Sequence, residues 1–185
     1  MLNNVENAVA AIASAISIGI AVDKIKKAIT SYIGVKRRFD KRIDFGDVVY
    51  IDDYAHHPEE LRACISSVRN LYPGKKITGI FQPHLYSRTR DFADEFAKSL
   101  SLLDELILLD IYPARELPIE GVSSQMLIDK VTIENKILIS KEELIIEVLK
   151  RKLEVLLTLG AGDIDQLVKP IEKSLTNIYN AVKGF

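Results

Sequence analysis

The stretch IDDYAHHP, Ile51 to Pro58, places two acids, a tyrosine and two of the three histidines of the chain directly after a short apolar run. Asp53, at the end of a predicted strand, could accept two hydrogen bonds from a ribose diol, as acids do in many nucleotide sites. The alternative is a carboxylate that caps a helix or a turn. Asp52 is expected to point to the opposite face, because side chains alternate along a strand.

The adjacent histidines, His56 and His57, are candidate metal ligands. Neighbouring side chains rarely chelate one ion, only His84 remains as a third imidazole, and no H-x-x-x-H or H-E-x-x-H spacing occurs. The single cysteine, Cys64, excludes an internal disulfide and a cysteine-based zinc site. We therefore predict no metal site, interpret His56 as a hydrogen-bonding partner for phosphate or carboxylate oxygen, and expect His57 to cap a helix.

A second polar cluster follows another apolar run, in the stretch FQPHLYSRTR, Phe81 to Arg90. His84, Arg88 and Arg90 crowd the start of a predicted helix, whose N-terminus also favours anions. This pattern predicts binding of a carboxylate or phosphate group. The alternative is that the arginines pair with acids on a solvated helix face, which suits Arg90, next to Asp91, better than Arg88.

The stretch GAGD, Gly160 to Asp163, is predicted to be a tight strand-to-helix turn in which the backbone could approach a ligand. It does not have the G-x-G-x-x-G spacing, so it is a weak signal alone. No G-x-x-x-x-G-K-[ST] motif or other phosphate loop with a lysine occurs in these 185 residues. If the protein uses ATP, this chain lacks the residues that hold its phosphates.

These polar stretches follow the apolar runs of a predicted α/β domain. Residues 38–44 and 48–51 are expected to form a hairpin with a turn at Phe45-Gly46-Asp47, and strand and helix patterns then alternate. The further strands are predicted at 76–81, 105–109, 136–139 and 154–159, and the helices at 59–71, 89–102, 124–131, 141–151 and 163–182. The alternation predicts a mainly parallel six-stranded sheet with one antiparallel edge strand and helices on both faces. Ligands of such sheets bind outside the carboxyl ends of the strands.

The N-terminal residues have a different pattern. A helix predicted from Asn4 to Ile18, with Asn4 as N-cap and Gly19 as its stop, carries small and branched apolar residues on nearly every side. A second helix, Val22 to Tyr32, is amphipathic. The first helix is therefore expected to need a partner: the second helix, or another copy of the chain.

Composition excludes several classes of protein. Lys+Arg 25 against Asp+Glu 26 gives no basic footprint for nucleic acid. A 48% hydrophobic chain of 185 residues can bury the core of one domain with an appendage. The apolar N-terminus contains Glu6, has no basic segment before it and is too interrupted to span a bilayer, so we predict no signal peptide, no membrane segment and a cytoplasmic location.

Six stretches in chain order together resemble the carboxy-terminal third of the alanine-adding enzymes of the Mur ligase family: NVENAVAA, GVKRRFD, IDDYAHHPEELRA, FQPHLYSRTRDF, DIYPARELPIEGVSS and LLTLGAGDI. The resemblance covers essentially the whole chain. It implies that residues 1–36 are the last helices of a central ATPase domain and that residues 37–185 form the Rossmann-like carboxy-terminal domain. About half or more of the enzyme would lie upstream.

The resemblance also implies a reaction: ATP-dependent amide formation between the carboxylate of UDP-N-acetylmuramate and the amine of L-alanine, in peptidoglycan precursor synthesis. ATP and Mg²⁺ are implied as cofactors, with the Mg²⁺ ligands outside this chain. The residues implied on the ATP side are Asn4 and Asn7 near the adenine, Arg38 at the terminal phosphate and Asp53 at the ribose.

A second group of residues matches the amino-acid and acyl-phosphate end of the family's site: Tyr54, His56, His84 and Arg88. His56 and Arg88 are implied to position the substrate. Two positions depart from the family pattern. Asn3 stands where histidine is common, and Leu85 follows His84 where many relatives have arginine, so that Arg88 or a main-chain donor would have to bind the amino-acid carboxylate.

Two alternatives stay open. One is a murein-tripeptide recycling ligase of the same family. The other is a non-catalytic receiver-like α/β module, because Asp52-Asp53 and Asp110 each end a strand; this interpretation needs a lysine after the last strand, and LLTLGAGD has none. Without a phosphate loop, the 185 residues alone are expected to be inactive.

Overall fold

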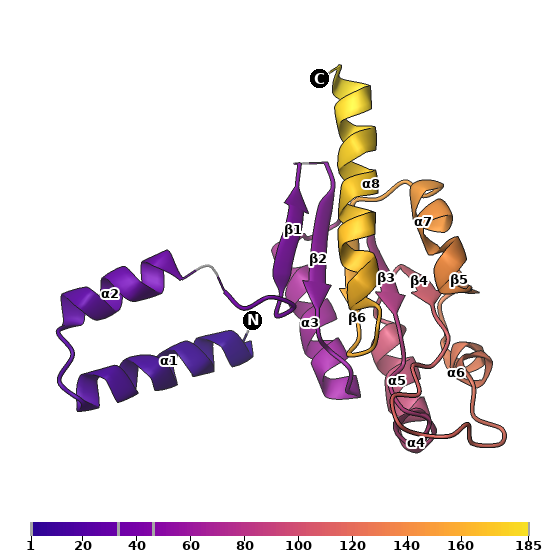
Figure 1. The fold of residues 1–185 in the computed structure, drawn as a ribbon, viewed down its shortest axis with the longest axis horizontal. Helices are drawn as coiled ribbons and strands as arrows, with labels where there is room; N and C mark the ends of the chain where they lie inside the picture. The colour runs from indigo at the N-terminus through magenta and orange to yellow at the C-terminus, as the bar shows by residue number, and fades with distance from the viewer. Residues whose placement is uncertain (1, 33, 46, 185) are drawn as a thin grey trace. The chain divides into compact units, whose positions relative to one another are not determined.

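The computed structural model describes residues 2–32, 34–45 and 47–184, and the chain divides into two compact units, Met1–Lys36 and Arg37–Phe185 (Figure 1). The first unit consists of α1 (Leu2–Ser17) and α2 (Val22–Ser31), which contact each other. Gly19, at φ +79°, lets the chain turn after α1. The prediction of Asn4 as N-cap is wrong, because no helix breaker precedes it and α1 extends back to Leu2.

Most apolar side chains of the first unit are exposed. Ile25 of α2 is buried, but Val5, Val9 and Ile16 of α1 keep 57%, 59% and 54% of their surface accessible. The contact between α1 and α2 therefore leaves much of the apolar surface of α1 uncovered, an arrangement that is typical of a surface built to meet a partner.

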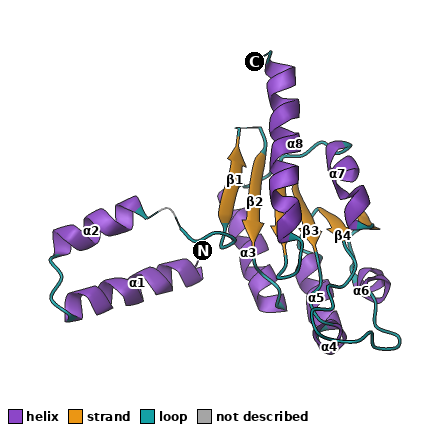
Figure 2. Ribbon diagram, viewed as in Figure 1, coloured by secondary structure: helices purple, strands orange, loops and turns teal. Residues whose placement is uncertain are grey.

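The second unit is a six-stranded sheet, with the strand order β1-β2-β6-β3-β4-β5 (Figure 2). The strands are β1 (Asp40–Asp44), β2 (Val49–Asp53), β3 (Ile77–Phe81), β4 (Glu105–Leu108), β5 (Lys136–Leu138) and β6 (Val155–Leu159). β1 pairs with β2 in the antiparallel sense, and every other pair is parallel. The predicted mainly parallel sheet with one antiparallel edge strand is confirmed.

Helices cover both faces of this sheet, as predicted. α3 (Pro58–Leu71), α5 (Ala93–Leu100) and α6 (Ser124–Lys130) pack on one hydrophobic core with Ile51 of β2, and α7 (Lys141–Leu149) and α8 (Asp165–Lys183) pack on a second core with Tyr50. Successive residues of β2 thus point to opposite cores, as the two-residue period of a strand requires.

The main differences from the sequence-based expectation concern one helix and the two strands of the hairpin. The helix predicted at 89–102 is two helices, α4 (Tyr86–Asp91) and α5, because Phe92 leaves helical geometry and packs its ring against His57 with centroids 4.7 Å apart. β1 begins at Asp40 because Arg37 and Phe39 have φ of 60° and 54°, which no strand accommodates. β2 continues to Asp53. Gly46 of the predicted hairpin turn lies outside the described residues.

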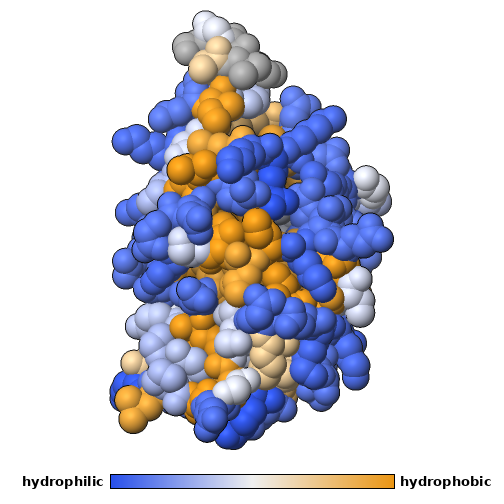
Figure 3. Space-filling model, turned by 90° about the vertical axis from the view of Figure 1, so that its right-hand side faces the viewer, coloured by the Kyte–Doolittle hydropathy of each residue, from blue (hydrophilic) through white to orange (hydrophobic). Residues whose placement is uncertain are grey.

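Hydrophobic side chains form a band on one face of the second unit, with hydrophilic residues on either side (Figure 3). Ile146 and Leu149 of α7 and Ile178 of α8 are among the exposed hydrophobic residues of this unit. Within the described parts of the chain, no helix combines the length and the hydropathy that a membrane span requires.

Candidate functional site

The polar stretches meet at the carboxyl ends of neighbouring strands. β6 pairs with both β2 and β3, so the end of β6 with its GAGD turn lies between DDYAHHP and QPHLYSR. A bridge between His84 and Tyr112 continues the pairing of β3 with β4 beyond the strands. The topology therefore brings residues from four strand ends to one edge of the sheet.

Asp53 closes the turn that follows β2. Its Oδ2 accepts a hydrogen bond from the Phe39 N–H at 2.7 Å, and its Oδ1 accepts one from the Ala55 N–H at 2.8 Å. Burial raises the pKa of this carboxyl above its usual value, although the two N–H donors oppose that effect. Asp53 thus serves as the turn carboxylate considered above, and each oxygen keeps a lone pair for a further donor.

Tyr54, His56, His84 and Arg88 lie side by side. The ring centroids of Tyr54 and His56 are 5.1 Å apart, and those of His56 and His84 are 6.1 Å apart. Arg88 Nη1 lies 3.4 Å from His84 Nδ1. Arginine only donates, so Nδ1 accepts and Nε2 of His84 carries the proton. The cluster therefore presents imidazole and guanidinium donors suited to an anionic oxygen.

The two arginines of α4 differ in their environment. Arg90 is exposed and pairs with Asp91 at 2.8 Å, as the solvated-face alternative expected. Arg88 is half-buried, and among the described residues it has no carboxylate within ion-pair distance. The N–H of Leu85 donates to Tyr112 O at 2.9 Å, so this main-chain donor is already used. Arg88 is therefore the donor at this end of the cluster that is left for a ligand carboxylate.

The two histidines of DDYAHHP have different partners. His57 forms a capping box with Glu60 at the start of α3, as predicted. His56 Nδ1 lies 3.0 Å from Tyr54 O and 3.2 Å from Glu60 Oε2, which fixes its ring at the edge of the cluster.

The GAGD turn is held tightly. Asp163 accepts hydrogen bonds from Gln82 Nε2 at 2.8 Å and from Lys141, and Gln82 Oε1 accepts one from the Ile164 N–H at 2.9 Å. These contacts, and the ion pair with Lys141, keep the pKa of Asp163 low despite its partial burial. The turn is therefore a rigid wall of the site.

Residues not predicted as site residues complete the cluster. Tyr112 stacks on His84 with centroids 5.6 Å apart, and the Arg37 guanidinium lies 5.3 Å from the Tyr54 ring centroid. Both could have been found from position alone: Tyr112 follows β4 within DIYPARE, and Arg37 is adjacent to the predicted Arg38. Among the residues that the structure describes, the non-glycine residues with positive φ are Arg37, Phe39, Leu85 and Ala114, and all lie near these strand ends, as strained residues often do at functional sites.

The residues predicted on the ATP side belong to both units: Asn4 and Asn7 to the first, Arg38 and Asp53 to the second. Arg38 is exposed and lies 5.7 Å from the Tyr54 ring centroid. Asn7 is exposed on α1, and the side chain of Asn4 lies outside the described residues. Their roles remain predictions.

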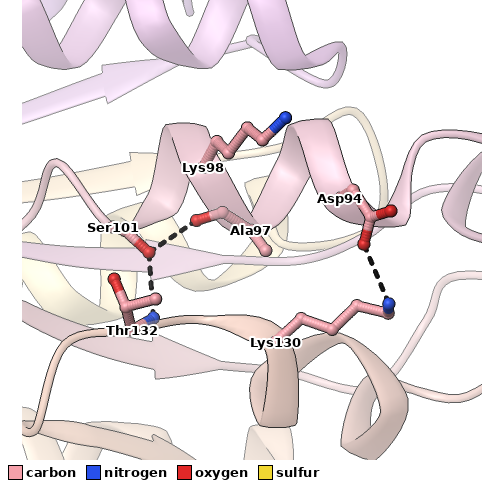
Figure 4. Close-up of a pocket in the computed structure, with 6 residues that line it drawn as sticks. All are labelled: Asp94, Ala97, Lys98, Ser101, Lys130 and Thr132. Atoms are coloured by element: carbon pink, nitrogen blue, oxygen red, sulfur yellow. Dashed lines mark hydrogen bonds and ion pairs between the residues drawn. The ribbon is translucent and has the colours of Figure 1, made fainter.

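A separate surface groove of about 470 Å³ lies between α5 and the segment after α6 (Figure 4). Several of its polar groups contact one another: Lys130 pairs with Asp94 at 2.8 Å, and the Thr132 N–H donates to Ser101 at 3.0 Å. None of the strand-end residues lines it. Across residues 2–32, 34–45 and 47–184, no three His, Cys, Asp or Glu side chains are placed to hold a metal ion.

The titration of His84 should report on the cluster. Burial, then Arg88, then His56 lower its pKa below 6.5, so the imidazole is neutral at pH 7. The unfolded chain binds this proton more readily, so the ionisation of His84 should destabilise the fold as the pH falls below about 6.5. By NMR titration, we expect Arg88→Ala to raise the pKa of His84 only part of the way, because burial remains. Arg90→Ala is the matched control, and an equal shift in both variants would contradict the arrangement.

Comparisons with known proteins agree with this architecture. The chain is 59% identical to UDP-N-acetylmuramate–L-alanine ligase of Parabacteroides distasonis over 93% of its length, and 49% identical to the enzyme of the same name from Cytophaga hutchinsonii over 99%. It spans 37% and 39% of the length of these two relatives.

Solved structures give the same result. The UDP-N-acetylmuramate–alanine ligase of Thermotoga maritima matches with a TM-score of 0.77 and 29% identity, over 95% of this chain and 38% of that one. A murein peptide ligase of Psychrobacter arcticus matches with a TM-score of 0.66 and 23% identity, over 96% of this chain and 38% of that one. Residues 37–162 match the family described as "Mur ligase, glutamate ligase domain". The chain belongs to the Mur ligase family.

Proposed function

We propose that this chain is the carboxy-terminal part of a ligase that joins the carboxylate of UDP-N-acetylmuramate to the amine of L-alanine at the expense of ATP. The observation that carries the proposal is the convergence of Asp53 with Tyr54, His56, His84 and Arg88 at adjacent strand ends, in a chain 59% identical to a ligase of that name. In this proposal, residues 1–36 are the end of a central ATPase domain, and residues 37–185 are the domain that closes over the nucleotide.

The structure supports two ends of one site. Asp53 and Arg38 would hold the ribose and the terminal phosphate, with Asn4 and Asn7 on the adenine side. The lone pairs that remain on the Asp53 carboxylate suit a ribose diol. ATP supplies the phosphoryl group that turns the muramoyl carboxylate into an acyl phosphate.

The other end positions the amino acid. Arg88 would bind the alanine carboxylate by charge-assisted hydrogen bonds, because it has no acid partner among the described residues. Nε2–H of His84, and His56 beside it, would donate to acyl-phosphate oxygens, and Tyr54 would pack against the substrate. The amine then attacks the acyl carbon and phosphate leaves, so the chain contributes position and charge stabilisation.

Other components would come from outside these residues. We propose that the ligands of Mg²⁺ lie in the full-length enzyme, outside this chain. The exposed apolar surface of α1 would meet the rest of that enzyme or, in the isolated chain, a second copy. We propose a cytoplasmic location and small-molecule partners, without nucleic acid or membrane.

The second candidate function is ligation of a murein tripeptide. It is favoured by the fold shared with the Psychrobacter arcticus murein peptide ligase, but at 23% identity this likeness concerns the fold alone. The higher identity to the alanine ligases favours alanine as the acceptor.

The proposal makes two measurable predictions, one for the isolated chain and one for the full-length ligase. The isolated 185-residue chain should form no UDP-N-acetylmuramoyl-L-alanine and should bind ATP only in the millimolar range, about 4 kcal/mol of binding free energy. The full-length ligase that contains it should use L-alanine in preference to a free tripeptide. Product analysis and isothermal titration calorimetry test both statements. Ligation by the chain alone, a submicromolar ATP affinity or a preference for the tripeptide would overturn the proposal.

A further inference from the structure

Arg37 makes directed contacts with several parts of the site, although it is not among the predicted site residues. Its Nε donates to Asp52 Oδ2 at 3.1 Å, and its Nη2 donates to Gly160 O at 2.6 Å. Its guanidinium lies 5.3 Å from the Tyr54 ring centroid, and its carbonyl accepts the Tyr54 N–H at 2.7 Å. One side chain thus joins the end of β2, the turn after β6 and the first residue of the amino-acid end.

Asp52 is the acid partner of Arg37. It is 1% exposed and accepts a second hydrogen bond from Thr158 Oγ1 at 2.7 Å, and Thr158 in turn contacts the buried hydroxyl of Tyr50 at 3.2 Å. Desolvation raises the pKa of Asp52, and the Thr158 hydrogen bond and the Arg37 charge oppose that effect. A buried carboxylate needs such partners, so removal of the Arg37 guanidinium would leave Asp52 without its cation.

The contacts of Arg37 require a planar fork. Nε donates to the Asp52 carboxylate on β2, and Nη2 donates to the carbonyl of Gly160 after β6. The same guanidinium lies near the Tyr54 ring. A lysine ammonium is a point donor on a flexible stem and cannot reproduce these contacts together. Loss of the fork would remove this contact from the Tyr54 ring, which then keeps Arg38 at 5.7 Å and the His56 ring at 5.1 Å, and the change would reach His84 through the packed rings.

We propose that Arg37, held by Asp52, is a positioning residue that fixes the Tyr54 ring and the Gly160–Asp163 turn at the amino-acid end of the site. This inference rests on the proposed ligase function and adds a residue to it. Arg37 acts through Tyr54 and the turn, and the conservative substitution Arg37→Lys therefore separates positioning from folding better than Arg37→Ala, which would leave Asp52 buried without a cation.

The test in the full-length ligase compares Arg37 with Arg69, a second arginine whose guanidinium donates to a carboxylate and to carbonyl groups. Arg69 donates to a carboxylate, Asp104 at 2.9 Å, and to the carbonyls of Lys75 and Leu102, away from the site. Arg37→Lys should lower kcat/KM for L-alanine about 30-fold and leave the KM for ATP within about threefold, because small displacements of positioned groups cost about this much. Asp52→Asn should act in the same direction. Arg69→Lys should change neither constant more than about twofold.

A second measurement is independent of activity. In ¹⁵N–¹H and aromatic NMR spectra of the 185-residue chain, Arg37→Lys should displace the Gly160 amide and the Tyr54 and His84 ring signals, and Arg69→Lys should not. If the wild-type ligase did not use alanine, the proposed function would fail while these spectra still decided the positioning role. Equal behaviour of Arg37→Lys and Arg69→Lys in both assays would overturn the inference.

Discussion

Replacement of Arg88 by alanine in the full-length ligase should reduce kcat/KM for L-alanine about 100-fold and leave the KM for ATP within about twofold. A charge-assisted hydrogen bond to a carboxylate contributes about 1.5–3 kcal/mol, and each 1.4 kcal/mol is about tenfold. The Leu85 N–H is already bonded to Tyr112 and therefore cannot replace the lost guanidinium. Steady-state kinetics with each substrate varied in turn measure both constants.

Two variants make this prediction specific. Arg90→Ala removes an exposed arginine of the same helix that already pairs with Asp91, and it should leave both constants unchanged. Asp53→Ala should show the opposite selectivity, with an increase in the KM for ATP and a smaller effect on alanine. If Arg88→Ala instead raised the KM for ATP and the KM for alanine equally, the assignment of two separate ends to this site would be wrong.

The sheet could be predicted because its signals are local. Five apolar runs separated by helical patterns predict a mainly parallel α/β sheet, and the hairpin predicted at residues 38–51 adds the antiparallel edge strand. The break at Phe92 could not be read from the sequence, because no helix breaker occurs there. It depends on a tertiary contact with His57. Likewise, the late start of β1 follows from positive φ at Arg37 and Phe39, a conformation that both residue types disfavour and that their sequence therefore does not predict.

The candidate site, like the sheet, could be predicted from the sequence only in part. A rule about strand ends was enough to find Asp53, His84 and Arg88, because their types and positions coincide. It could not find Arg37, since that role arises from a contact with Gly160, 123 residues away in sequence. The alternative for Asp53, a turn carboxylate, is present in the structure together with the capacity for a ligand, so the two interpretations were not exclusive.

Gly162→Ala should destabilise the second unit and disturb the site at once. A Cβ at this position would approach Gln82 Oε1 and lie 2.7 Å from Tyr112 Cβ. Gln82 cannot swing aside freely, because it is 2% exposed and bonded to both Asp163 and the Ile164 N–H. Tyr112 is held through its backbone by Pro83 and Leu85. Overpacking of this kind costs about 2 kcal/mol of unfolding free energy, or about 4–8 °C in Tm for a unit of this size.

Gly121 provides the control for Gly162→Ala, because a positive φ constrains it and close neighbours do not. Gly121 has φ +74° but nothing within 4 Å of its Cβ position, so Gly121→Ala should cost only about 1 kcal/mol, from backbone strain, and should leave the site intact. Urea unfolding compares the two free energies, and the ring signals of His84, which stacks on Tyr112, report the site. Because the Gly162 clash is with Tyr112 and Gln82, only Gly162→Ala should shift those signals. Unshifted His84 signals with a stability loss no larger than that of Gly121→Ala would show that the GAGD turn yields without strain and does not form a rigid wall.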